Sequence, residues 1–63
     1  MITTETRNVI RQHANDTGAE RYRITREGEV HYYGQMPNSI ETGWYFVGWD
    51  ADEVAAEIRA SRL

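Results

Sequence analysis

The sequence predicts a small α+β domain: a helix, a three-stranded antiparallel meander, and a C-terminal helix packed on one face of the sheet. Three observations predict it. Each end of the chain carries an apolar stripe at helical spacing, three short runs between them have the composition of strands, and turn residues separate the runs. At 63 residues the chain holds one domain. We expect it to span residues 1–63, with an N-terminal helical segment at 1–18 that can be mobile and a βββα core at 20–62.

The first helix is expected over residues 3–16. Thr3 or Thr4 can cap its start, and Gly18 can adopt the left-handed conformation that ends it. Its stripe is thin, with two or three large apolar side chains, so the helix needs support from the rest of the fold. The stripe consists of Ile2, Thr6, Val9, Ile10 and His13.

Two strands are expected next, over residues 20–26 and 29–35. The turn between them contains Gly28, which supplies the left-handed conformation of a tight hairpin. Side chains alternate between the two faces of a strand. We therefore expect an inward set of Tyr22, Ile24, Val30 and Tyr32. The second face would carry Arg21, Arg23, His31, Tyr33 and Gln35.

A turn at Met36-Pro37-Asn38-Ser39 leads to the third strand, expected over residues 43–49. This strand is apolar on both faces, so its alternation permits two registers, which exchange the faces. We favour the register with Trp44 and Phe46 inward, and with Gly48 making room for the following helix. The second face would then receive Tyr45, Val47 and Trp49.

The last helix begins after Asp50, a favourable N-cap residue with Glu53 three positions later, as in a capping box. Acidic residues in its first turn and Arg59 and Arg62 in its last turn complement the helix dipole. Alanines on its inward stripe permit close approach to a sheet. That stripe consists of Ala51, Val54, Ala55, Ile58 and Arg62.

The second face of the sheet has two alternative environments. The N-terminal helix can cover it, with Val9 and Ile10 on the sheet, or much of it can be exposed. Arginine with tyrosine and tryptophan is typical of binding hot spots and also of nucleic-acid stacking platforms. The loop after the second strand adds two apolar side chains that can enter a partner's groove. The candidate binding residues are Arg21, Arg23, His31, Tyr33, Tyr45 and Trp49 on the face, and Met36 and Ile40 in the loop.

Composition argues against several other classes. The chain has no cysteine, and its two histidines, His13 and His31, are far apart, so we expect no metal, no cofactor and no catalytic residues. No apolar run reaches the ~18 residues of a membrane span, and residues 1–5 do not resemble a signal peptide, so we expect a cytoplasmic protein without membrane contact. The net charge of −3, with no lysine among the seven basic residues, disfavours non-specific nucleic-acid binding.

The segment from Trp44 to Ala55 runs from an aromatic strand through Gly48 and the Asp50 cap into an alanine-rich helix. In outline this resembles the AP2/integrase-type DNA-binding fold, over about a third of the chain. Domains of that type read DNA with a basic sheet face. The resemblance implies that Arg21, Arg23 and Arg26 correspond to those basic residues.

We therefore expect a small non-enzymatic protein-binding module of the regulator or inhibitor type. Such compact domains occur among the proteins of phages and other mobile elements. Its partner is another protein, which can be a second copy of the chain, because a core this small gains from reinforcement. The alternative is a nucleic-acid-binding module that uses Arg21, Arg23, Tyr33 and Trp49.

Overall fold

The computed structural model describes residues 2–62, so positions 1 and 63 of the expected domain lie outside the described residues. Along the chain lie α1 (Thr4–Asp16), β1 (Arg21–Ile24), β2 (Val30–Gln35), β3 (Thr42–Gly48) and α2 (Ala51–Ser61). The three strands pair in chain order, and both pairs are antiparallel. The protein is a small α+β domain of the predicted order, helix, meander, helix.

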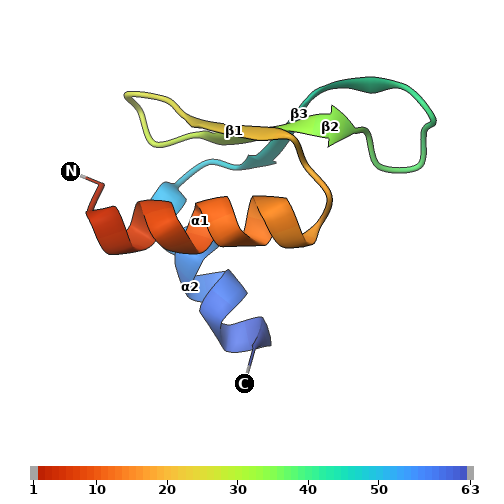
Figure 1. Ribbon diagram of the computed structural model, residues 1–63. Coiled ribbons are helices and arrows are strands. Elements are labelled where there is room, and N and C mark those ends of the chain that lie inside the picture. The colour runs from red at the N-terminus through yellow and green to blue at the C-terminus, as the bar shows by residue number, and fades with distance from the viewer. Residues whose placement is uncertain (1, 63) are drawn as a thin grey trace.

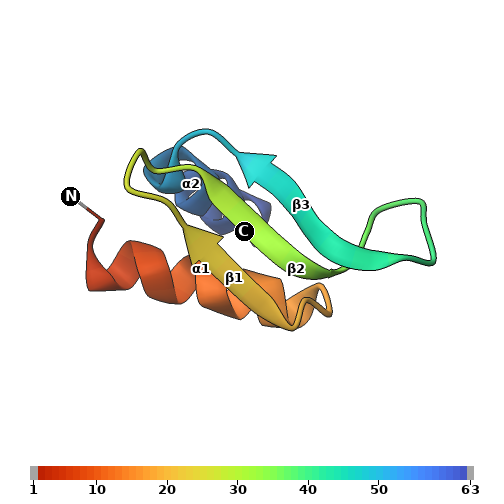
Figure 2. The same cartoon turned by 90° about the horizontal axis from the view of Figure 1, so that it is seen from above.

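Both helices lie on the same side of the sheet (Figures 1 and 2). α1 packs against β1, α2 packs against β3, and the two helices pack against each other. We call the helix-covered side the inner face and the opposite side the outer face. Of the two alternatives for the second face, coverage by the N-terminal helix is wrong, because α1 shares the inner face with α2.

The hydrophobic core lies between the inner face and the two helices. Val30 and Tyr32 of the central strand are buried, and Tyr22 and Ile24 of β1 pack against them, as the alternation predicted. The other buried core residues come from the helices: Ile10 and Ala14 of α1, and Ala51, Val54, Ala55 and Ile58 of α2.

Side-chain caps explain where the helices begin. The Thr3 hydroxyl accepts a hydrogen bond from the Thr6 N–H (3.1 Å). Asp50 Oδ1 accepts from the N–H groups of Asp52 (2.9 Å) and Glu53 (3.4 Å). Each cap satisfies N–H groups that have no partner inside the helix. Both caps confirm the start positions that the sequence predicted.

Two polar contacts join the helices near the start of α1. The Thr6 hydroxyl donates to Asp52 Oδ1 (3.0 Å), and Arg59 Nη2 donates to Glu5 Oε1 (2.8 Å). α1 therefore uses α2 as much as the sheet for support. A narrow apolar stripe is sufficient when a helix packs into the angle between another helix and a strand.

A bulge in β3 changes which residues face the core. Val30 pairs with Gly48 and His31 pairs with Phe46, so Val47 is an extra residue that breaks the alternation. Val47 packs against the core, and a Cβ placed on Gly48 would lie 2.5 Å from Val54 Cγ2. Both Val47 and Gly48 therefore belong to the inner side.

The favoured register of the third strand is consequently wrong. Tyr45 and Val47 lie on the inner face, packed against the core, whereas Trp44 and Phe46 lie on the outer face and are 40% and 45% exposed. Two placements hold in spite of this: Gly48 lies against α2, and Trp49 is 74% exposed. The bulge explains why both placements hold although the register is wrong, because the extra residue returns Trp49 to the side of Phe46.

Candidate binding surface

The outer face presents two rows of side chains that run across all three strands. In one row Arg21 of β1 pairs with Tyr33 of β2, which pairs with Trp44 of β3. In the next row the corresponding residues are Arg23, His31 and Phe46. Each row thus has an arginine at the β1 edge and aromatic rings across β2 and β3.

The rings of the outer face contact one another edge to face or tilted. Ring centroids are 5.3 Å apart for Tyr33 and Trp44, and 5.6 Å apart for His31 and Phe46. Trp49, just beyond the end of β3, packs on Phe46 at 4.6 Å. Cross-strand aromatic pairs of this kind stabilise a sheet and hold the rings in fixed orientations. The result is two neighbouring ring clusters, Tyr33 with Trp44 and His31 with Phe46 and Trp49.

The two arginines of the outer face lie over aromatic rings. Arg23 Cζ is 4.8 Å from the centroid of Trp44, and Arg21 Cζ is 5.8 Å from that of Tyr33. These are cation–π distances. Such stacking orients the guanidinium groups while leaving their N–H donors free for a ligand.

The electrostatic character of the outer face is positive, although the whole chain is negative. The side chains that β1, β2 and β3 place there include no carboxylate, since the set is Arg21, Arg23, His31, Tyr33, Gln35, Thr42, Trp44 and Phe46. Glu29, just before β2, lies at its margin, with Oε1 3.4 Å from His31 Nε2. Within residues 2–62, neither Arg21 nor Arg23 forms an ion pair with a carboxylate.

The structure brings five of the eight predicted binding residues together on the outer face: Arg21, Arg23, His31, Tyr33 and Trp49. Tyr45 is the exception on the sheet, because it lies on the inner face with its ring 6.0 Å from that of Tyr32. Met36 and Ile40 lie in the β2–β3 loop, which extends beyond the sheet (Figure 2). Ile40 is 92% exposed, and Met36 is half-buried.

Trp44 and Phe46 are the outer-face residues that the sequence reasoning missed. The available signal was Gly48, because a glycine near the end of a strand often marks a bulge. Trp44 and Trp49 are five positions apart, so strict alternation places them on opposite faces. One bulged residue between them places both on the same face.

Comparison with protein-family models, with curated proteins and with solved structures gives no match. The resemblance to the AP2/integrase-type fold is therefore one of outline, and the outer face must be interpreted from its own chemistry.

Among residues 2–62 there is no group of three or more His, Asp or Glu side chains that could hold a metal ion. No helix in this range is long and apolar enough to cross a membrane. Burial raises the pKa of Tyr32, which belongs to the core and not to the outer face.

Proposed function

We propose that the protein is a small non-enzymatic binding module that acts through protein–protein contact, with the outer face as its docking surface. The observation that supports this most is the exposure of Trp44, Phe46 and Trp49 on a face that neither helix covers. Contiguous exposed apolar surface of this kind marks interaction sites in soluble proteins. Tryptophan, tyrosine and arginine are also the residues that dominate binding energy at interfaces.

The geometry suits binding in a second way. The aromatic rings and the stacked arginines are already held by their cross-strand neighbours, so docking costs little side-chain entropy. An ordinary interface buries about 800 Å² on each partner, roughly a sixth of the 4697 Å² surface of this chain. The outer face and the exposed Ile40 of the β2–β3 loop would each contribute part of that area.

Affinity capture with matched variants tests the proposal. Wild-type protein and a Trp44→Ala/Phe46→Ala variant are used as bait in lysate of the native cells, with Arg59→Ala on the helix side as the control. Any captured protein is then purified and titrated while the tryptophan emission of the bait is followed. We expect a captured partner to bind the double variant at least about 30-fold more weakly than the wild type, because two central contacts are lost. Its affinity for Arg59→Ala should be unchanged.

A second copy of the chain is one form of this partner. Sedimentation at rising concentration detects it, and the Trp44→Ala/Phe46→Ala variant should then remain monomeric. A wild-type protein that stays monomeric, and that captures nothing through Trp44 and Phe46, contradicts the proposal.

A second candidate function is nucleic-acid binding. One observation favours it: Arg21, Arg23, Tyr33 and Trp44 gather on one face of a three-stranded sheet, as on a stacking platform. The opposing consideration is that two arginines supply few phosphate contacts. Binding of labelled single-stranded and duplex DNA at low salt distinguishes the two functions. A nucleic-acid module should bind, weaken steeply with salt, and lose binding in Arg23→Glu.

A further inference from the structure

One side of β1 is an open strand edge. β1 is the first strand of the sheet and pairs only with β2. The Thr25 N–H donates to the Glu29 carbonyl (2.9 Å) and closes the hairpin. This bond determines which residues of β1 have their backbone groups directed at β2. Because bonded pairs alternate along an antiparallel ladder, the backbone groups of Tyr22 and Ile24 point away from β2. No backbone or side-chain hydrogen bond in the described structure occupies this side of Tyr22 or Ile24.

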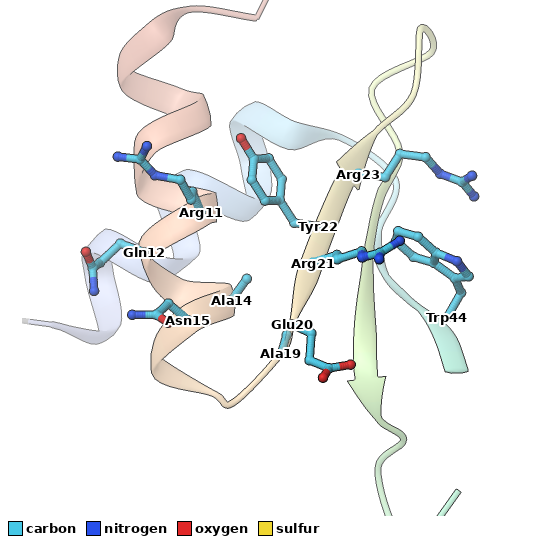
Figure 3. A pocket seen from close by; sticks show the side chains of 10 residues that line it. All are labelled: Arg11, Gln12, Ala14, Asn15, Ala19, Glu20, Arg21, Tyr22, Arg23 and Trp44. Atoms are coloured by element: carbon cyan, nitrogen blue, oxygen red, sulfur yellow. The ribbon is translucent and has the colours of Figure 1, made fainter. Parts of the chain in front are cut away.

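A groove of about 810 Å³ runs beside this edge (Figure 3). Four consecutive residues, 20–23, form one wall, and α1 forms the other with Arg11, Gln12 and Asn15. Ala14 and Ala19 also line it, and their small side chains keep the space between α1 and β1 open. The groove therefore follows the strand along a length of about 13 Å, which suits an extended peptide.

The side chains of β1 divide between the two sides of this edge. In Figure 3 the Tyr22 ring points toward α1, whereas Arg21 and Arg23 point to the opposite side, toward Trp44. A strand added at the edge would continue this division. Alternate residues of the added strand would lie beside the two arginines, and the residues between them would lie over Tyr22 and α1.

The groove is basic in a protein that is acidic overall. Three arginines line it, Arg11, Arg21 and Arg23, against one carboxylate, Glu20. Within residues 2–62 none of these arginines forms an ion pair, whereas Arg59 of α2 and Arg62 at its C-cap are paired with Glu5 and Asp16. Of the five arginines in this range without an ion pair, three therefore lie where the strand edge is open, and the other two, Arg7 and Arg26, lie elsewhere.

We propose that this groove binds an extended acidic segment of a partner protein, which adds to β1 as a fourth strand. Main-chain hydrogen bonds to Tyr22 and Ile24 would give affinity, and the side-chain alternation would give specificity. The preferred segment alternates acidic residues, placed beside Arg21 and Arg23, with apolar residues, placed over Tyr22.

The same charges disfavour a second copy of the chain at this edge. Pairing β1 with another β1 would bring arginines close to arginines, and like charges facing each other across strands are destabilising. The occupant is therefore a different protein. This inference rests on the proposed function, in that it assumes a protein-binding module. It uses the β1 edge and α1, shares Arg21, Arg23 and Trp44 with the outer face, and can fail separately.

A peptide series tests the proposal. The probe is a labelled ten-residue peptide of alternating Glu and Val, measured by fluorescence anisotropy. Three controls accompany it: a peptide of the same composition with the Glu and Val residues in two blocks, an alternating Lys-Val peptide, and an alternating Glu-Val peptide N-methylated at every second residue. We expect the alternating acidic peptide to bind at least about tenfold tighter than each control, and to protect the amides of Tyr22 and Ile24 from hydrogen exchange.

Protein variants locate the binding site. Arg11→Glu and Arg23→Glu should each weaken the Glu-Val peptide at least about tenfold, whereas Arg59→Glu, a charge reversal on α2, should not. The Trp49→Ala variant removes an exposed aromatic contact of the outer face and leaves every residue of the groove in place, so it should bind the peptide normally. It therefore separates failure of the groove from failure of the outer face.

Two results would overturn the inference. If the block and alternating peptides bind equally, only charge is recognised, and single-stranded DNA should then compete as well as the peptide. If exchange protection appears on β3 instead of at Tyr22 and Ile24, the strand adds at the other edge of the sheet.

Discussion

Tyr32 is the residue that connects the sheet to α1. Its side chain is 2% exposed. The hydroxyl lies 2.9 Å from His13 Nδ1 and 3.4 Å from the Ile10 carbonyl oxygen. Its inward position was predictable from alternation, because Val30 and Tyr32 have the same parity. The partners of its hydroxyl were not, because they depend on how α1 crosses the sheet.

Tyr32 should make folding sensitive to high pH. Burial, with a smaller contribution from Tyr45, raises its pKa from 10.0 to about 12. The unfolded state therefore loses this proton at lower pH than the folded state does. The stabilisation is complete below pH 10 and is lost as the pH rises toward 12, with a loss of up to roughly 2–3 kcal/mol.

Urea denaturation at a series of pH values from neutral to alkaline measures this effect. Tyr32→Phe has no proton to lose at this position, so its stability should fall less between pH 10 and 12 than that of the wild type. Equal alkaline slopes for the two proteins would show that Tyr32 is not the group responsible.

At the scale of elements, the sequence was sufficient for the five elements, their caps and their turns. Those features are local: Asp50 and Thr3 cap the helices, and Gly28 and Asn38 adopt positive φ values of 94° and 57°. The faces of β1 and β2 also followed from alternation, because each has a polar side.

The phase of β3 could not be read in the same way. Its residues from Gly43 to Trp49 are apolar on both sides, so hydrophobic pattern does not distinguish the two registers. The bulge at Val47 then shifts the alternation of side chains between the two faces, so residues before and after it follow different patterns. The side of the sheet on which α1 packs was equally inaccessible, because it is decided by contacts with α2 that no local pattern encodes.

The contact between β3 and α2 depends on the absence of a side chain at Gly48. An added Cβ would lie 2.5 Å from Val54 Cγ2, and the β-branched Val54 side chain has little rotamer freedom in a helix. We expect Gly48→Ala to destabilise the fold by about 1–3 kcal/mol through overpacking. In a Val54→Ala background the same substitution should cost less, because the clashing methyl group is gone.

A double-mutant cycle by chemical denaturation measures this coupling, which should be of the order of 0.5–3 kcal/mol for residues in contact. If the cost of Gly48→Ala is the same in both backgrounds, the strain lies in the β3 backbone and not in the contact with Val54.

At the scale of the whole molecule, the core is one-sided. Within residues 2–62, the eight buried core residues lie between the inner face and the helices. A chain of this length buries only about 60% of its unfolded surface, and this one leaves much of its aromatic surface on the outer face. Stability and the proposed binding are thus assigned to opposite faces of the same three strands.

This division predicts that neighbouring residues of β3 contribute differently to stability. Tyr45→Ser removes a ring that packs against the core and contacts Tyr32 at 6.0 Å. Phe46→Ser removes a ring that is 45% exposed and contacts His31 and Trp49. We expect the first substitution to cost at least about 1 kcal/mol more than the second, a large fraction of the roughly 3–5 kcal/mol available to such a domain.

Thermal and urea unfolding of the two variants measure the difference. Tryptophan quenching by acrylamide checks directly which side chains lie on the outer face. Both Trp44 and Trp49 lie on the outer face, so both should be accessible to the quencher in the folded protein, and Trp49 more so than Trp44. Single Trp44→Phe and Trp49→Phe variants separate the two signals. The opposite order of stabilities, with Phe46→Ser the more damaging, would mean that β3 is held in the other register. Trp44 and Phe46 would then belong to the core, and the outer face would lose the aromatic surface on which the proposed binding depends.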